Sequence, residues 1–251
     1  MNDPRYHKPI KAIIFDMDGT IVDTELVWER ATKKPLEKRG VCNFTPEQEE
    51  FLESFAGSGI EEWAYQVKEV FKLDDHHHVI AAEAVSNAAE GFAGDLSFIE
   101  GFEQFHSFVL KQSLKNCIAT NTRQEAFDKI IERLQFKGYF GEHLYSIDHV
   151  GGIAKPDPKL FLHAAEQLGV DPSECLVFED SIYGFQAASA AGMRCVAIKN
   201  KRNKDLLMHV DYAVQDYHEA FELLSNLLDK AKQEQALLAL EINSRGTQQE
   251  L

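Results

Sequence analysis

The chain has 251 residues, with 26 Lys and Arg against 41 Asp and Glu, which gives a formal charge of −15. Nucleic acids and anionic membrane surfaces draw their protein partners largely through Lys and Arg, so this acidic chain without a basic stripe is expected to bind neither. With 44% apolar and 27% charged residues, the composition is typical of a folded globular protein and not of a disordered one.

The sequence carries no signal for a membrane or an oxidising compartment. No apolar run approaches the roughly 18 residues of a membrane helix, and the segment Met1 to Lys11 is polar, so we expect a cytoplasmic protein. The cysteines form no CxxC pair, and three of them fall inside short apolar runs, which favours buried reduced thiols over disulfides. They are Cys42, Cys117, Cys175 and Cys195.

Short apolar runs alternate with helical patterns along the chain. Continuous apolar runs suit strands that are buried on both faces, so the alternation predicts a Rossmann-like parallel sheet with helices on both faces. The expected strands are Ala12–Phe15, Asn116–Ala119, Leu144–Ile147, Leu176–Phe178, Cys195–Ile198 and a short one at Tyr212–Val214.

A long insertion interrupts this alternation between the first and second strands. From residue 24 to residue 94 the chain shows helical spacing without a strand, and it is far longer than a βαβ crossover requires. We therefore predict an inserted all-helical domain at 23–95, with 1–22 plus 96–251 forming the sheet domain. The connections are expected at 22–25 and 92–97.

Several helix ends can be predicted from local residues. Thr122 followed by Glu125 resembles a capping box, Asp157-Pro158 predicts an N-cap with Pro at the first helical position, and Gly169 ends that helix. His76-His77-His78 is interpreted as a solvated turn whose side chains point in different directions. One or two helices are expected over 221–241, followed by a solvated tail at 244–251.

Two acidic side chains follow the first strand, in the segment Phe15-Asp16-Met17-Asp18-Gly19-Thr20. Side chains two positions apart on an extended chain point the same way, so Asp16 and Asp18 should converge at the carboxyl edge of the sheet. Open α/β sheets bind their ligands at that edge. Gly19 lets the backbone turn close to a bound group.

Three other stretches bring polar side chains to the same edge. The second strand ends in Thr120-Asn121-Thr122, Lys155 precedes the fourth strand, and the fourth strand ends in Glu179-Asp180. Because the strands of a parallel sheet all end on one edge, these acids, hydroxyls and the lysine are predicted to meet in one crevice.

In these motifs the chain resembles the haloacid dehalogenase-like hydrolase superfamily, in its branch of helical-cap phosphatases and phosphoglucomutase-like enzymes. The segment 16–20 resembles the first family motif, Thr120 the second, Lys155 the third and Glu179-Asp180 the fourth. The resemblance covers the chain from Lys11 to about His218 and implies that the inserted helices form a cap over the site.

The resemblance implies a Mg²⁺-dependent phosphatase that hydrolyses a small phosphomonoester, such as a sugar phosphate, through an aspartyl phosphate. Asp16 would be the nucleophile and Asp18 the general acid/base. Mg²⁺ would be held by the side chains of Asp16 and Asp180 and the backbone carbonyl of Asp18, with Glu179 acting on the metal through water.

The phosphate group would be bound by Thr120, Asn121 and Lys155. Lys155 supplies a compact positive charge, and the hydroxyl of Thr120 can donate to a phosphoryl oxygen. The segment 55–61 resembles the family's cap loop that dips into the site, where Gly57 would approach the substrate; a simple helix–helix turn is the alternative.

Three other functions share features with this sequence. A phosphosugar mutase on the same fold would carry an arginine in the cap loop and a histidine soon after the first motif, and those positions fall on Ile60 and Trp28. A receiver-type signalling domain would be much shorter. An inactive phosphometabolite-binding protein would lack a catalytic residue, and none is missing. We expect a monomer or small homo-oligomer whose partner is a small phosphorylated metabolite.

Overall fold

The structure is a computed structural model that describes residues 4–55, 57–94 and 96–246, with side chains described up to residue 233. Its centre is a six-stranded sheet in which every strand pair is parallel, in the order β3-β2-β1-β4-β5-β6. All six predicted strands are present. Their bounds are β1 Ala12–Phe15, β2 Lys115–Thr120, β3 Leu144–Ser146, β4 Cys175–Glu179, β5 Arg194–Ile198 and β6 Tyr212–Val214.

Helices cover both faces of this sheet, as the unbroken apolar strands require. Alternate residues of β1 show the division: Ala12 and Ile14 pack with one hydrophobic cluster, whereas Ile13 and Phe15 pack with another. The first cluster contains α8 (Lys159–Leu168) and α9 (Ile182–Ala190). The second contains α5 (Phe102–Lys111), α6 (Gln124–Leu134), α7 (Phe136–Phe140) and α10 (Tyr217–Gly246).

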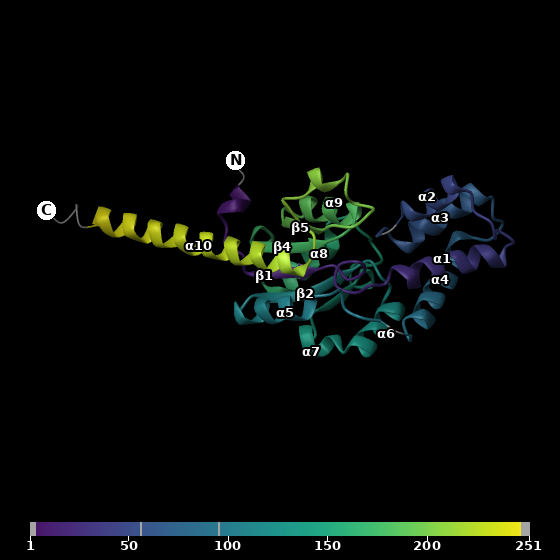
Figure 1. The fold of residues 1–251 in the computed structure, drawn as a ribbon, viewed down its shortest axis with the longest axis horizontal. Coiled ribbons are helices and arrows are strands. Elements are labelled where there is room, and N and C mark those ends of the chain that lie inside the picture. Colours follow the sequence, from purple (N-terminus) through teal and green to yellow (C-terminus); the bar gives the residue numbers. More distant parts are fainter. Residues whose placement is uncertain (1–3, 56, 95, 247–251) are drawn as a thin grey trace.

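Four helices lie between β1 and α5: α1 (Glu25–Lys38), α2 (Pro46–Glu53), α3 (Ile60–Phe71) and α4 (His77–Gly91). They have a hydrophobic cluster of their own, built around Leu36, Trp63 and Ile80. Figure 1 shows them together beyond one end of the sheet, on the side opposite the free end of α10. As predicted, the described residues from 23 to 94 contain no strand.

The chain leaves and re-enters the sheet region at adjacent points. Val22 forms a parallel bridge with Asp18 and an antiparallel bridge with Phe98. The backbone N–H of Asp23 also donates to the carbonyl of Ser97 over 3.3 Å. The two connections are therefore tied to each other and to the segment that carries Asp16 and Asp18.

The structure corrects the prediction of the α6 start. Helix α6 begins at Gln124, and Arg123 is its N-cap without a side-chain capping bond. The predicted capping box at Thr122 is wrong, because the hydroxyl of Thr122 donates to Asp18 instead. Helix α8 begins at Lys159, one residue after the predicted start, and Gly169 ends it as predicted.

The three histidines at the start of α4 differ in two respects from the predicted solvated turn, because His77 and His78 already belong to the helix. His76 and His78 are exposed, but the rings do not diverge: the centroids of His77 and His78 lie 4.2 Å apart. His76 is the extended N-cap of α4, and its ring stacks on that of His77 with centroids 4.5 Å apart.

The remaining predictions concern the cysteines and the C-terminus. The thiols of residues 117, 175 and 195 are free and buried. A single helix, α10, occupies the C-terminal segment through residue 246, so residues 244–246 of the predicted tail are helical and 247–251 lie outside the described part.

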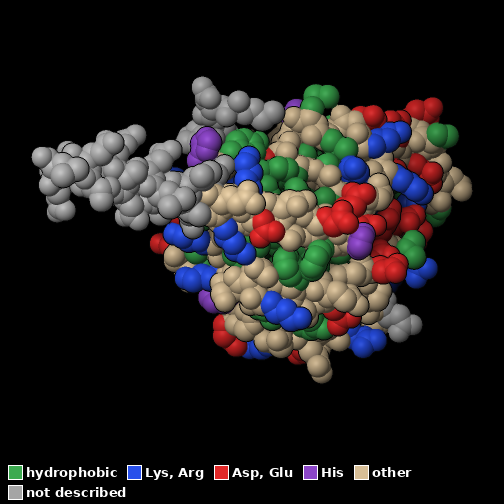
Figure 2. All heavy atoms as spheres, turned by 60° about the vertical axis from the view of Figure 1, so that its left-hand side comes forward, with side chains coloured by type: hydrophobic (Ala, Val, Ile, Leu, Met, Phe, Trp, Pro, Cys, Tyr) green, Lys and Arg blue, Asp and Glu red, His purple; other side chains and the backbone are tan. Residues whose placement is uncertain are grey.

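Among the described residues, no helix is long and apolar enough to span a membrane. On the face in Figure 2, acidic and basic side chains are interspersed.

Candidate active site

Asp16 follows directly after β1, and its backbone N–H continues the sheet by donating to the carbonyl of Phe178 over 2.9 Å. Its side chain is only 8% exposed, and its Oδ1 lies 2.6 Å from Nζ of Lys155. The second oxygen, Oδ2, has no hydrogen-bond partner in the part of the chain that the structure describes. One oxygen of the predicted nucleophile is thus held while the other is free.

Lys155 lies between two carboxylates in the interior. Its side chain is 1% exposed, and Nζ also lies 2.8 Å from Oε1 of Glu179. Burial alone would lower the pKa of Lys155, but the adjacent carboxylates of Asp16 and Glu179 outweigh burial and raise it. Lys155 therefore stays positively charged. As the sequence predicts, its side chain lies beside the acids at the edge of the sheet.

Glu179 uses both of its oxygens within the protein. Oε1 accepts from Lys155, and Oε2 accepts from the backbone N–H groups of Asp180 and Ser181 over 2.8 Å each and from the Ser181 hydroxyl over 3.0 Å. Glu179 thereby fixes the turn between β4 and α9 and holds Lys155 in place.

Asp18 is surrounded by hydrogen-bond donors. Its Oδ1 accepts from the Thr24 hydroxyl and from the indole N–H of Trp28, both over 2.7 Å. Its Oδ2 accepts from the hydroxyls of Thr122 over 2.7 Å and Thr120 over 3.2 Å. Four donors to one carboxylate fix its orientation.

Three of these four donors were not identified as site residues from the sequence. Thr24 lies in the connection to α1 and Trp28 lies on α1 itself, while the local sequence around Thr122 predicts a helix cap. Thr24 and Trp28 lie six and ten residues after Asp18, so only the turn of the chain into α1 brings them back to it.

Asn121 joins the inserted segment to the loop that carries Lys155. Its Nδ2 donates to the carbonyl of Gly57 over 3.0 Å, and its Oδ1 accepts from the backbone N–H of Lys155 over 2.9 Å. Gly57 has φ +82°, and a Cβ at this position would collide with the side chain of Ser181. Gly57 therefore lies directly against the turn between β4 and α9.

Asp180 occupies the fourth strand end, close to Asp16. Asn200, which the sequence reading missed, donates from Nδ2 to its Oδ2 over 2.9 Å, and Asn203 donates to its carbonyl over 2.8 Å. Gly19, with φ +73°, passes so close to Asp180 that a Cβ would overlap its carboxylate. The glycine of the first motif is required by this packing.

The acids Asp16, Glu179 and Asp180 form a cluster that suits a hard divalent cation. One oxygen from each lies within 4.8 Å of the others, and carboxylates are ligands that Mg²⁺ prefers. Burial, opposed by Lys155 and reinforced by Glu179 and Asp18, raises the pKa of Asp16 to about 7. Burial, then Glu179 and Asp16, also raise the pKa of Asp180. Beside Lys155 alone, the site therefore resists carrying the negative charges of all three acids, and a bound cation would compensate them, so the residues fit a metal.

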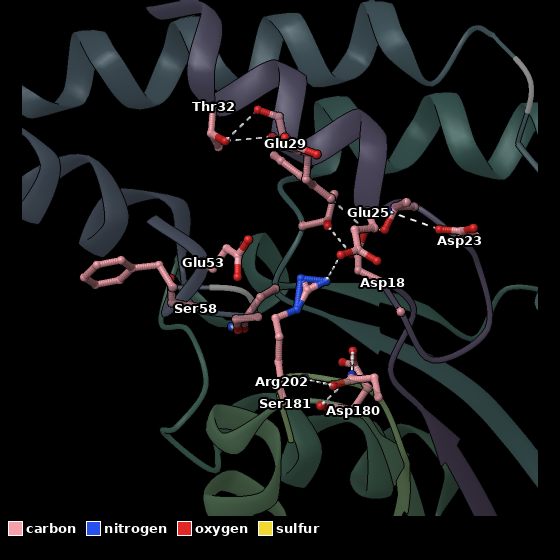
Figure 3. A pocket seen from close by; sticks show the side chains of 18 of the residues that line it. Asp18, Asp23, Glu25, Glu29, Thr32, Glu53, Ser58, Asp180, Ser181 and Arg202 are labelled. Carbon is pink, nitrogen blue, oxygen red and sulfur yellow. Dashed lines mark hydrogen bonds and ion pairs between the residues drawn. The ribbon is translucent and has the colours of Figure 1, made fainter. Parts of the chain in front are cut away.

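A cavity of about 640 Å³ opens above these acids, between the sheet edge and helices α1–α3. Asp16, Asp18, Asp180, Asn121 and Gly57 line it. Figure 3 shows Asp18 and Asp180 facing the cavity, with residues of α1 and α2 on its far side. Thr120 and Lys155 are buried behind its surface.

Comparisons with known proteins agree with this arrangement. The family model for the haloacid dehalogenase-like hydrolases matches residues 10–192. Fructose-1-phosphate phosphatase YqaB of Escherichia coli is 30% identical over 192 residues, covering 74% of this chain and 95% of that protein. The 6-phosphogluconate phosphatase of the same organism is 29% identical, covering 73% of this chain and 80% of that protein.

A solved structure shares the fold over most of this chain. The β-phosphoglucomutase of Clostridium difficile matches with a TM-score of 0.73, covering 88% of this chain and 98% of that one. Its identity to this chain is 23%, so the likeness concerns the fold alone.

Proposed function

The chain belongs to the haloacid dehalogenase-like hydrolase family, whose model covers residues 10–192, and on this premise we propose that it is a Mg²⁺-dependent phosphatase of a small phosphomonoester. It is a phosphoric monoester hydrolase, like the relatives named as phosphatases. One observation carries the proposal: Asp16 is paired with buried Lys155, while Asp18, two residues later, is held by four separate donors. The two acids are thereby suited to different tasks.

We assign Mg²⁺ to the side chains of Asp16 and Asp180 and to the backbone carbonyl of Asp18. When bound, the ion neutralises the charge of the phosphoryl oxygens and of the acids around it. Glu179 acts on this site through water, because both of its oxygens already accept hydrogen bonds from the protein.

In the first step, the free carboxylate oxygen of Asp16 attacks phosphorus, and the bond from phosphorus to the leaving oxygen breaks. Lys155 keeps its charge beside Asp16 and offsets the repulsion between a carboxylate and an anionic phosphoryl group. Asp18, protonated at this stage, gives its proton to the leaving oxygen. The product of the step is an aspartyl phosphate and a free alcohol.

In the second step, a water molecule attacks the phosphorus of the aspartyl phosphate. Asp18, now a carboxylate, takes a proton from this water, and the bond between phosphorus and Asp16 breaks. Inorganic phosphate leaves, and both acids return to their starting states. The donors around Asp18 keep its carboxylate aimed at the reacting oxygen in both steps.

We propose that Thr120, Asn121 and Lys155 form the phosphate site. Asn121 holds the loop that carries Lys155 against the segment that carries Gly57, because its side-chain amide bonds to the backbone of both residues. Residues 23–95 are proposed as a cap on a core made of 1–22 plus 96–251. Closure of the cap would exclude water during the first step, and its opening would admit water for the second.

The rival function on this fold is a phosphosugar mutase. At the two positions where such a mutase would carry Arg and His, this chain has Ile60 and Trp28, and neither can pair with a phosphate as Arg does. The hydrolase is therefore the function proposed. The cytoplasmic location and the monomeric or small homo-oligomeric state stay predictions.

The test offers the purified protein an aryl phosphate and a hexose 1-phosphate, with Mg²⁺ and without any bisphosphate activator. Release of inorganic phosphate from these esters is the expected result. Conversion of the hexose 1-phosphate to its 6-phosphate in equal amount, with little free phosphate, would replace the hydrolase by the mutase.

A further inference from the structure

The cavity above Asp16 is much larger than a phosphate group. Its volume of about 640 Å³ is within the range of pockets that enclose whole small molecules. A phosphoryl group at the sheet edge would fill only its floor, so the rest of the wall must face the leaving group.

Carboxylates dominate this wall. Figure 3 shows Glu29 and Glu53 on the side of the cavity away from Asp180. Beyond the catalytic acids and Asp180, six acidic residues line the cavity against three basic ones. The acids are Asp23, Glu25, Glu29, Glu49, Glu53 and Glu100, and the basic residues are Lys33, Arg123 and Arg202.

Each of the three cations is already paired with a carboxylate. Lys33 Nζ lies 2.8 Å from Glu29 and 3.9 Å from Glu49, and its pKa is raised chiefly by the hydrogen bond to Glu29. The guanidinium of Arg202 lies 2.8 Å from Oε1 of Glu25, the first residue of α1. Arg123 lies 3.1 Å from Asp148, outside the cavity. Among the described lining residues, none is a cation left over for a second anion on the substrate.

Among the described residues, neither Glu53 nor Glu100 has a cation within ion-pair distance, and the charge of Glu53 only adds to the rise in the pKa of Lys33 from farther away. Carboxylates accept hydrogen bonds from hydroxyl and ammonium groups and repel anions. Aromatic side chains also line the cavity, among them Trp28, Phe55 and Phe98. Their faces can cover the C–H surface of a compact polyol.

We propose that the cavity selects phosphomonoesters whose leaving group is rich in hydroxyl or amino donors and carries no second anionic group. This inference rests on the proposed phosphatase function and specifies its substrate class. A second phosphate or a carboxylate would face acids that have no ion-pair partner among the described residues, or would have to displace a carboxylate from Lys33 or Arg202. Repulsion by the acids and displacement of a bound carboxylate both weaken the binding of an anionic leaving group, whereas a neutral sugar meets neither cost.

The experiment compares three hexose derivatives of similar size whose leaving groups differ in charge: glucose 6-phosphate, glucosamine 6-phosphate and 6-phosphogluconate. Steady-state kcat/KM is measured for each with Mg²⁺, beside an aryl phosphate as a general substrate. We expect the neutral and cationic esters to exceed the anionic one by about tenfold or more, and the gap to narrow in high salt, which screens exposed charges.

Two matched charge reversals test whether the acids of the cavity wall cause the preference against the anionic ester. Glu53→Lys, in the wall, should reduce the preference against 6-phosphogluconate about threefold or more. Glu132→Lys changes the net charge by the same amount on α6, outside the cavity, and should leave the preference unchanged. Equal effects of the two substitutions would overturn the inference.

The possible results distinguish failure of the proposed phosphatase function from failure of the substrate inference. If the aryl phosphate is not hydrolysed, the proposed function fails. If it is hydrolysed but 6-phosphogluconate is used as well as glucose 6-phosphate, the phosphatase stands and the substrate inference is wrong. Turnover of the aryl phosphate with none of the three hexose esters would also overturn the inference.

Discussion

The indole Nε1 of Trp28 lies 2.7 Å from Oδ1 of Asp18, so a helix of the inserted segment directly contacts the predicted acid/base. Thr24, at the entrance to the same helix, donates to the same oxygen. Any movement of α1 relative to the sheet therefore changes the number of donors to Asp18. The position of the inserted helices and the orientation of the catalytic acid are linked.

Trp28→Phe should lower kcat about tenfold with little change in KM. Phenylalanine keeps an aromatic ring against Phe92 but loses one hydrogen bond to a charged group, a contribution of about 1.5–3 kcal/mol. Steady-state kinetics and a thermal unfolding curve together test this. An unchanged kcat in a folded variant would show that the indole does not position Asp18.

The roles of Asp18 and Asp180 should separate in metal binding. Asp18→Asn keeps the backbone carbonyl and should bind Mg²⁺ nearly as well as wild type, while turnover collapses because the proton donor is gone. Asp180→Ala should weaken Mg²⁺ binding itself. Calorimetric titration of both variants measures this, and an equal loss of affinity would contradict the assignment of distinct roles.

The sequence predicted the strands and the motif residues for definite physical reasons. Strands buried on both faces must be apolar throughout, so Ala12–Phe15 could be delimited to the residue. The edge strand Tyr212–Val214 was also delimited to the residue, although Tyr212 and Ala213 are only half-buried. Asp16, Lys155 and Asp180 follow from the rule that parallel strands end on one edge. The roles of these residues stay proposals.

The donors to Asp18 could not be predicted in the same way. Thr122 has the local pattern of a helix cap, and only the tertiary structure shows that its hydroxyl turns to Asp18. Trp28 reaches Asp18 because of the angle at which α1 leaves the sheet, and no local pattern records that angle. The contact of Gly57 with Ser181 likewise joins residues more than a hundred positions apart.

Gly57→Ala should impair catalysis beyond its cost in stability. Alanine at φ +82° is strained by about 1–2 kcal/mol, and its Cβ would also push against Ser181 in the turn after Glu179. We expect kcat/KM to fall about tenfold or more. The matched control is Gly40→Ala, which has the same φ of +82° but nothing within 4 Å. If both variants lose stability equally and both keep full activity, the loop contact has no catalytic role.

His106 should make stability depend on pH. It is 2% exposed, and burial lowers its pKa below the ordinary 6.5 despite the hydrogen bond to Asn116. Below pH 6.5 the unfolded chain therefore binds a proton that the folded state resists, so stability is lost as pH falls from 6.5 through the folded pKa.

The control for this prediction is His106→Gln, which stays neutral over the whole range. The free energy of unfolding of wild type minus that of the variant should fall by up to about 1.4 kcal/mol per pH unit in this window. A difference that does not change between pH 7 and pH 5 would show that His106 does not resist protonation.

The most direct test of the central claim compares wild type with Asp16→Asn for release of inorganic phosphate from an aryl phosphate in the presence of Mg²⁺. Asparagine keeps the size of the side chain and removes its nucleophilic charge, so we predict that turnover is lost while the fold, monitored by circular dichroism, is kept. Wild-type activity should disappear with EDTA and return with added Mg²⁺. Turnover of the Asp16→Asn variant at a rate near wild type would contradict the assignment of Asp16 as the nucleophile.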